Sequence, residues 1–270
     1  MQASSEVAYF DTNILSHLAQ NRQLWSKLGV FLAENNLVLG ISSAHVAELA
    51  DVTRQHQALA ELFVSIPSGI LKTWDVILAE EIQAHPQKRS QSLFAHLFTP
   101  TEPDNLQRIQ AFLSSKNLRY ARQDQLNYAQ QMTGRHDQLK SNFPPHRTGK
   151  YTIEQAEQFA WMQVIQWLGQ IHRDFLVRFQ NNIQDFHTNV FLSIRLFAQV
   201  IFYKYYIGQR EPKKISDFGD LAHIFPIPYC NMLITERDLC NILNQIKRNH
   251  DTLSSTVIHN IDFFGNWKPT

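Results

Sequence analysis

The sequence contains little cysteine and little glycine. It has two cysteines, Cys230 and Cys240, and nine glycines in 270 residues. Two cysteines exclude a disulfide scaffold and cannot alone supply the four ligands of a structural zinc site, and they are typical of a reducing compartment such as the cytoplasm. No glycine-rich turn follows the first apolar run, which argues against a dinucleotide-binding enzyme.

Neither sign of charge predominates. Lysine and arginine together number 25, against 24 aspartates and glutamates, for a formal net charge of +1. A protein that coats a polyanion is usually strongly basic, so any contact with nucleic acid must be made by a local patch of charge. The apolar fraction of 44% excludes wholesale disorder and supplies a core for one large domain or two small ones.

The sequence also lacks a long uninterrupted hydrophobic run. Its first residues are polar and Asp11 ends the first apolar run, so we expect no signal peptide here. The only candidate for a membrane span, 190–207, contains Arg195, Gln199 and Lys204. Their spacing leaves an apolar helical face, which favours a buried helix over a membrane span. We therefore expect a cytoplasmic protein without a membrane partner.

Short apolar runs separated by helical patterns indicate an α/β fold. Residues 7–10 and 37–41 are typical of buried parallel strands, and apolar side chains at helical spacing follow each of them. Alternation of strand and helix in this way predicts a parallel sheet flanked by helices. A further apolar stretch at 69–73 leads into another helix, and strands are expected again at 229–234 and 256–258.

The middle of the chain differs from both ends. From about residue 85 prolines and polar residues become frequent, and residues 151–206 are almost free of glycine and proline and rich in apolar side chains. We therefore expect one discontinuous domain. Residues 1–84 and 210–270 would form the two parts of its sheet, and residues 85–209 a large all-helical insertion.

Acidic residues accompany the predicted strands. Asp11 and Glu236 directly follow predicted strands, Glu48 lies in the second helical turn after the strand at 37–41, and Asp220 lies in the helix that precedes the strand at 229–234. Ligands of parallel sheets bind outside the carboxyl ends of the strands. Carboxylates gathered there repel one another, and Mg²⁺ or Mn²⁺ relieves the repulsion by taking oxygen ligands. Each acid could instead be a helix cap or a solvated charge, but the position of Asp11 directly after an apolar strand favours a function.

Three segments resemble the motifs of PIN-domain nucleases. Residues 9–15, Tyr-Phe-Asp-Thr-Asn-Ile-Leu, are similar to the opening motif of that family, and Glu48 matches its second acid. Residues 220–237 resemble the third block, in which an acid in a short helix precedes a strand that ends in Thr and a further acid. The resemblance covers about 7–82 and 215–265 and leaves out the middle of the chain.

The resemblance implies a PIN-like sheet and metal-dependent hydrolysis of phosphodiester bonds, most often by an endoribonuclease acting on single-stranded or structured RNA. It implies that the catalytic and metal-binding acids are Asp11, Glu48, Asp220 and Glu236, with Mg²⁺ or Mn²⁺ as cofactor. The residues that would orient these acids or contact phosphate are Asn13, Thr235, Asp217, His223 and Asp238. The fourth acid is either Glu236 or Asp238, and Asn231 stands where related sequences often carry Asp.

Two other interpretations compete with that of a nuclease. A haloacid-dehalogenase-type phosphatase also begins with Asp after its first strand, but it needs a second Asp at the position of Asn13. A PIN-like module that binds RNA or a protein without catalysis is favoured by Asn231 and by the near-neutral charge. The presence of Asp11, Glu48 and Asp220 favours the nuclease. A protein partner or a homodimer is compatible with either interpretation.

Overall fold

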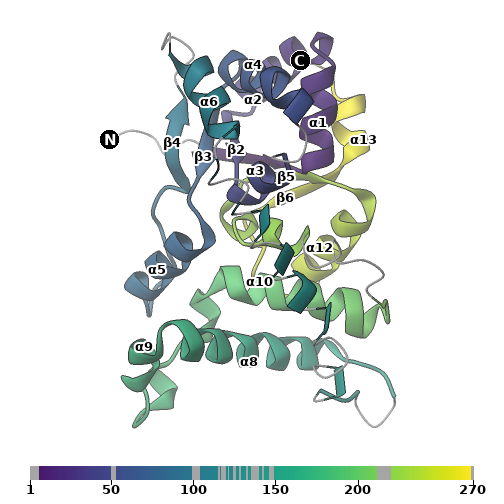
Figure 1. Ribbon diagram of the computed structural model, residues 1–270. Helices are drawn as coiled ribbons and strands as arrows, with labels where there is room; N and C mark the ends of the chain where they lie inside the picture. Colours follow the sequence, from purple (N-terminus) through teal and green to yellow (C-terminus); the bar gives the residue numbers. More distant parts are fainter. Residues whose placement is uncertain are drawn as a thin grey trace.

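Figure 1 shows the computed structural model of the protein, which describes residues 6–49, 53–98, 104–114, 149–211 and 220–268, with short pieces between 116 and 145. In these residues a six-stranded, mostly parallel sheet is flanked by helices, which confirms the predicted α/β class. The expected strands at 7–10, 37–41, 229–234 and 256–258 all form, with shifted ends at the last two. The apolar stretch at 69–73 contributes a further strand.

The strands of the sheet are β1 (Glu6–Phe10), β2 (Leu37–Ile41), β3 (Ser68–Leu71), β4 (Phe94–Phe98), β5 (Met232–Thr235) and β6 (Val257–Asn260). Their order across the sheet is β4-β3-β2-β1-β5-β6. Neighbouring strands run parallel, except that β4 is antiparallel to β3. The two ends of the chain therefore meet at the centre of the sheet, where β1 pairs with β5.

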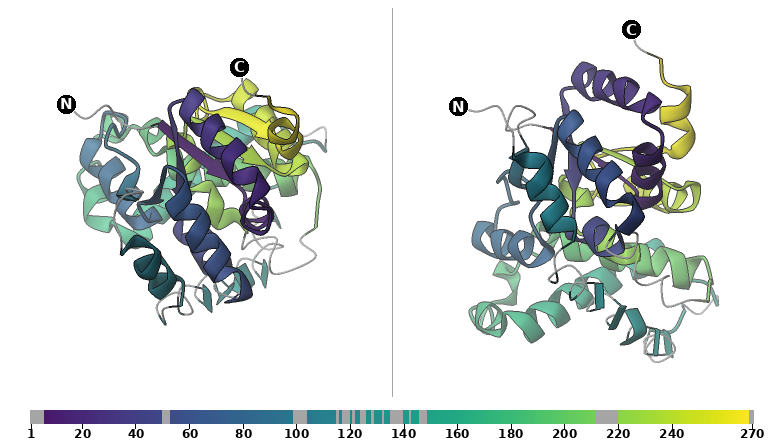
Figure 2. Two further views of the ribbon diagram at one scale, coloured as in Figure 1. Left: turned by 90° about the horizontal axis from the view of Figure 1, so that it is seen from above. Right: turned by 45° about the horizontal axis from the view of Figure 1, so that its top comes forward.

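Helices cover both faces of the sheet (Figure 2). One face packs against α1 (Thr12–Gln20), α2 (Gln23–Glu34), α4 (His56–Ser65), α6 (Asn105–Leu113) and α13 (Ile261–Asn266). The other face packs against α5 (Trp74–Ala84), α10 (Leu192–Ile201) and α12 (Arg237–Asn249), and α8 (Ile153–Ile171) lies on the outer side of α10. The shorter elements are α3 (Ser43–Leu49), α9 (Arg173–Val177), the π-helix η4 (Phe202–Ile207), and the 3₁₀ turns η1 (Thr53–Gln55), η2 (Ile183–Asp185), η3 (Thr188–Val190), η5 (Asp220–Ile224) and η6 (Ile227–Tyr229).

The central strand β1 contributes to a core on each face. Successive side chains of a strand point to opposite faces of the sheet. Val7 and Tyr9 accordingly join the core that contains α8, α10 and α12, whereas Ala8 and Phe10 join the core of α1, α2 and α4. All four side chains are buried, so β1 and the residue that follows it are held firmly between two layers.

The apolar run at 190–207 forms a buried helix, as predicted. All ten residues of α10 are buried, and the helix continues directly into η4. The charge of Arg195 is met by Glu157 of α8 at 2.9 Å and by Asp251 at 3.0 Å. In the described residues no single helix is long and apolar enough to cross a membrane, and only the bent pair Ile183–Val190 with Leu192–Ile207 meets the length and composition requirement together.

The prediction that residues 85–209 are all-helical was wrong at 94–98, which form β4. This strand lies at the edge of the sheet, and its three middle side chains are exposed. A strand held mainly by backbone pairing with one neighbour needs no alternating apolar pattern, so no such pattern indicated β4. Gly69 of β3 permits the close approach, because an added Cβ would lie 2.6 Å from the carbonyl oxygen of His96.

Candidate functional site

The strand order places a topological switch point at the centre of the sheet. From β1 the chain moves to β2 and β3 on one side, and β5 and β6 lie on the other side, so the direction of winding reverses between β1 and β5. In open α/β sheets, ligands bind at such a point outside the carboxyl ends of the strands. Asp11 directly follows β1, and Glu236 directly follows β5 at the same edge.

A pocket of about 190 Å³ lies at this position. Its walls include the five described acids that the sequence analysis assigned to the site, namely Asp11, Glu48, Asp220, Glu236 and Asp238. Three predicted supporting residues that are not acids also line it: Asn13, Thr235 and His223. Residues from both ends of the chain therefore line one pocket. Asp217 lies outside the described residues.

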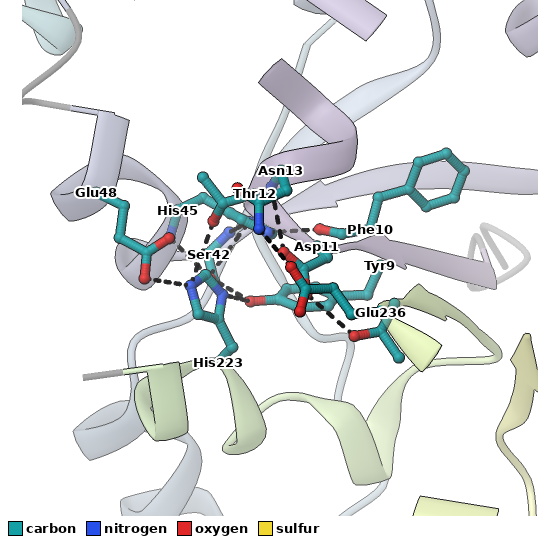
Figure 3. A network of polar contacts seen from close by, with 11 residues as sticks. Tyr9, Phe10, Asp11, Thr12, Asn13, Ser42, His45, Glu48, His223 and Glu236 are labelled. Carbon is teal, nitrogen blue, oxygen red and sulfur yellow. Dashed lines mark hydrogen bonds and ion pairs between the residues drawn. The ribbon is translucent and has the colours of Figure 1, made fainter. Parts of the chain in front are cut away.

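The end of β1 and the end of β5 are joined by hydrogen bonds between polar side chains (Figure 3). Asp11 occupies the N-cap of α1, where its carboxylate accepts a hydrogen bond from the Asn13 backbone N–H at 3.1 Å. The Thr235 hydroxyl donates to the other oxygen of Asp11 at 3.1 Å. The Asn13 amide in turn donates to Glu236 Oε1 at 2.6 Å. Asp11 and Glu236 are thus held side by side through Asn13 and Thr235.

Glu48 is held on the other side of the pocket by His223. The Glu48 Oε1 atom lies 3.0 Å from His223 Nε2, and both side chains are largely shielded from water. Burial by itself would raise the pKa of Glu48, but the hydrogen bond and positive charge of His223 and a hydrogen bond from Thr12 lower it to about 2. Burial opposes ionisation of His223 as well, yet its bond with Glu48 and the charge of Asp11 raise its pKa above the ordinary value.

A buried polar network beneath the pocket positions this pair (Figure 3). The Tyr9 hydroxyl lies 2.7 Å from His223 Nδ1 and 2.7 Å from Ser42 Oγ. His45 Nδ1 accepts from the Ser42 N–H at 3.1 Å, so Nε2 carries the proton that is donated to the Phe10 carbonyl at 2.6 Å. Burial lowers the pKa of His45 to about 3, so this imidazole is neutral near pH 7.

Tyr9, Ser42 and His45 were missed by the sequence analysis. They lie in a strand and at the start of a helix whose other side chains are mostly apolar, so nothing in their sequence context marks them as parts of a site. One signal was present: His45 and Glu48 are three residues apart, and this spacing places two side chains on neighbouring positions of a helix. His45 fixes the end of β1 to α3 and so couples the position of Asp11 to that of Glu48.

Asp220 lies at the rim of the pocket, in η5. More than a third of the residue is accessible to solvent. Its carboxyl nevertheless lines the pocket, and desolvation there, followed by the negative charges of Glu48 and Asp11, raises its pKa to about 6. Burial is the largest cause of this rise, and the charges of the other two acids add to it.

The two candidates for the fourth acid have different partners. Glu236 accepts from Asn13 and lies at the N-cap position of α12, next to the Asp11 cluster. Asp238 instead forms a two-pronged ion pair with the Arg210 guanidinium, with one N–O distance of 2.6 Å. This ion pair lowers the pKa of Asp238 and neutralises its charge. The geometry favours Glu236 as the fourth acid.

Asn231, where an acid was expected from the resemblance, does not line the pocket. It lies at the opposite end of β5, where its side-chain oxygen accepts from the Val7 N–H at 2.9 Å. Its backbone N–H donates to the Val7 carbonyl at 2.9 Å, and its own carbonyl accepts from Val257. The Asn at this position therefore connects three strands, and it removes no ligand from the pocket.

Lys204 is a further residue of the site that the sequence analysis missed. It extends from η4, outside the segments that carry the resemblance, and lines the pocket together with Val200 of α10. Its positive charge lowers the pKa of Asp220 and of Asp238. No sequence pattern marks it, because Lys204 was interpreted as one of the polar interruptions of an otherwise apolar helix.

The donor chemistry of the pocket suits a hard divalent cation. Carboxylate oxygens are the ligands that Mg²⁺ and Mn²⁺ prefer, and five carboxylates line this pocket. In the part of the chain that the structure describes, however, no three His, Cys, Asp or Glu side chains form a group that could hold a metal ion as they stand. Metal binding would therefore require side-chain rotation, most directly of Glu48, which is paired with His223.

Comparisons with protein-family models, with curated proteins and with solved structures found no match to this chain.

Proposed function

We propose that the protein is a divalent-metal-dependent nuclease of PIN-like fold, with single-stranded or structured RNA as its substrate. One observation carries the proposal. Asp11, Glu48, Asp220 and Glu236 are brought from opposite ends of the chain into one pocket, at the carboxyl edge where the sheet reverses its winding. The motif resemblance at residues 9–15 and 220–237 supports the same assignment, and it is the basis for RNA as substrate.

The four acids would hold Mg²⁺ or Mn²⁺. When bound, such a cation lowers the pKa of a coordinated water and stabilises charge on a phosphodiester. Asp11 is the best prepared of the acids, because Asn13 and Thr235 fix both of its oxygens. His223 holds Glu48 as a carboxylate, and Asn13 fixes the position of Glu236. These neighbours limit the side-chain freedom that would be lost on forming the site.

The proposal is tested by RNA cleavage with and without divalent metal. Cleavage of a panel of single-stranded and hairpin RNAs should require Mg²⁺ or Mn²⁺ and cease on addition of EDTA. Asp11→Asn removes a negative charge but keeps an N-cap residue whose side-chain oxygen still accepts from the Asn13 N–H, while its amide nitrogen faces the Thr235 hydroxyl, which can accept from it, so the fold should survive. We expect at least about a hundredfold loss of rate, because metal activation and charge stabilisation each supply several kcal/mol.

Asp185→Asn provides a matched control. Asp185 is an exposed acid of η2 that accepts from Asn182 and lies outside the pocket lining. The Asp185→Asn variant should cleave RNA at the rate of the wild type. Equal activity of Asp11→Asn and wild type, or metal-independent cleavage by both, would contradict the assignment.

The alternative is a module that binds RNA without cutting it. The absence of a preformed three-ligand group in the described residues and the engagement of Glu48 by His223 favour this alternative. It predicts that the wild type binds RNA with the same affinity in EDTA and in Mn²⁺, that it cleaves no RNA or DNA of the panel, and that isothermal titration detects no uptake of Mn²⁺.

A further inference from the structure

Helix α10 continues directly into a π-helix. η4 spans Phe202–Ile207, and the N–H of Gly208 donates to the Tyr203 carbonyl, five residues back, at 3.0 Å. Single turns of π-helix are rare and are frequently found at functional sites. Four of the six residues of η4 are buried aromatic side chains, so the conformation of this turn is fixed by the core.

Lys204 is the charged residue of this turn and is partly buried. Its Nζ lies 5.4 Å from the centre of the Tyr205 ring, and Val200, one α-helical turn earlier, lines the same pocket. Among the lining residues of the described pocket, Lys204 is the only lysine or arginine. The buried aromatics of η4 therefore hold one ammonium group at an otherwise acidic pocket.

The charge of Lys204 acts on the acids across the pocket. It lowers the pKa of Asp220 at the rim and contributes to lowering that of Asp238, in both cases through charge. Asp238 already has a bidentate partner in Arg210. The charge of Lys204 therefore reaches acids on both η5 and α12.

A pocket lined by carboxylates repels a phosphodiester unless positive charge is placed beside it. The net charge of +1 gives no general attraction for a polyanion, so the attraction has to be local. A lysine ammonium is a compact point charge with three donors and is a common ligand of phosphate. When partly desolvated and fixed in advance, it also stabilises charge that develops on the phosphate during displacement.

We propose that Lys204 contacts a non-bridging oxygen of the RNA phosphodiester that enters the pocket, and that the π-helix η4 positions it to do so. This inference rests on the proposed function for the identity of the substrate. It assigns to the helical segment, which the motif resemblance does not cover, a direct part in substrate recognition. Lys204 would then be a catalytic residue that touches the substrate.

The test compares Lys204→Gln with Lys204→Arg and with Lys88→Gln. Lys88 pairs with Asp251 at 3.5 Å, beyond the end of α12 that is remote from the pocket, and its side chain is half exposed. Binding of a single-stranded RNA is measured by fluorescence anisotropy in EDTA, over a series of salt concentrations. Loss of one phosphate contact lowers the slope of log affinity against log salt by about 0.7. We expect this change in Lys204→Gln, with weaker binding, and wild-type slopes in Lys204→Arg and Lys88→Gln.

Binding and cleavage together separate this inference from the proposed function. If the wild type binds RNA with a slope that depends on Lys204 but does not cut, the contact holds and the nuclease assignment fails. If the wild type cuts and Lys204→Gln keeps both its slope and its cleavage rate, the contact is overturned and the nuclease stands. A wild type that binds no RNA overturns both. Should Lys204→Gln not fold, Lys204→Met removes the same charge and keeps an unbranched side chain against Tyr205.

Discussion

His223 and Glu48 are separated by 175 positions in the sequence and are joined at 3.0 Å between Nε2 and Oε1. The contact connects η5 to α3 at the mouth of the pocket. Because Asp220 lies in the same short turn as His223, the position of Asp220 relative to Glu48 depends on this pair. The pair therefore organises the acidic pocket, and it contributes to stability in a way that depends on pH.

The stabilisation by the Glu48–His223 pair should be largest between pH 4.5 and 6.5. The pKa of Glu48 falls from 4.5 to about 2 on folding, so its contribution is present above 4.5 and is lost as the pH falls toward 2. The pKa of His223 rises above 6.5, so its contribution is complete below 6.5 and is lost as the pH rises through the higher folded value. A double-mutant cycle of Glu48→Gln and His223→Gln, by urea unfolding in EDTA, should give a coupling energy of about 2 kcal/mol in this window.

A coupling energy that does not change between pH 5 and pH 9 would contradict this prediction, because it would show that the contact does not involve two charges.

A buried acid outside the pocket, Glu81, should make stability depend on pH in the direction opposite to Glu48. Glu81 of α5 is fully buried and accepts from the Ser193 N–H and hydroxyl, each at 2.9 Å, and from the Tyr229 hydroxyl at 2.5 Å, all through one oxygen. Its other oxygen has no partner. Burial raises the pKa of Glu81 from 4.5 to about 7, so the folded state loses stability as the pH rises from 4.5 to 7.

Glu81→Gln should remove this loss. The amide has the shape of the protonated acid and no charge, so the variant should be more stable than the wild type by about 3 kcal/mol above pH 7 and equal to it near pH 4. Chemical denaturation at pH 4, 6 and 8 measures the difference. Glu80→Gln is the neighbouring control, because Glu80 is paired with Lys72 and Arg89 and should lose stability on substitution. Equal pH profiles for wild type and Glu81→Gln would refute the buried-acid explanation.

The sequence was sufficient for the parallel part of the sheet and for the acids at its edge, but not for the antiparallel strand β4. Asp11 and Glu236 could be placed because a residue directly after a parallel strand has only one edge at which to lie. Glu48 and Asp220 were placed by motif resemblance, and the structure puts both on the same pocket. Whether these acids bind metal remains a prediction.

The sequence did not reveal the contacts made by side chains far apart in the chain. Tyr9 looks like an ordinary core residue of β1, and its hydroxyl has a partner only because His223 and Ser42 reach it from other elements. Lys204 falls in an apolar helical pattern, and the wider π turn changes the direction in which such a residue points. Long-range polar contacts and a local change of helix type leave no periodic signal.

Asn231 should affect stability and leave the pocket unchanged. Its side chain satisfies the Val7 N–H at the end of the sheet opposite to the acids. Asn231→Leu leaves that buried N–H without an acceptor, which should lower the free energy of unfolding by about 1–3 kcal/mol. Asn231→Asp still offers an oxygen and should unfold closer to the wild type. Mn²⁺ affinity, measured by isothermal titration, should be the same in both variants and in the wild type, and tighter binding by Asn231→Asp would count against this placement.

The last prediction concerns the fourth acid. Glu236 is bonded to Asn13, which also contacts Asp11, whereas the charge of Asp238 is neutralised by Arg210. Glu236→Gln removes a charge beside Asp11, and Asp238→Asn removes a charge that is already paired. We therefore expect Glu236→Gln to reduce Mg²⁺-dependent cleavage by at least about tenfold, and Asp238→Asn by less than about threefold, since loss of a half-exposed ion pair has a small effect.

Both variants remove one negative charge from α12, within its first turn or at its cap, so general electrostatic effects on RNA binding are matched between them. The comparison is made at saturating RNA and repeated with Mn²⁺ titrated into each protein, because a metal ligand should alter the metal concentration needed for half-maximal rate. Arg210→Gln adds a further check: it releases Asp238 from its ion pair and should leave the effect of Glu236→Gln undiminished. A larger loss in Asp238→Asn than in Glu236→Gln would place the fourth acid at Asp238 and would mean that the Arg210 pair opens when metal binds.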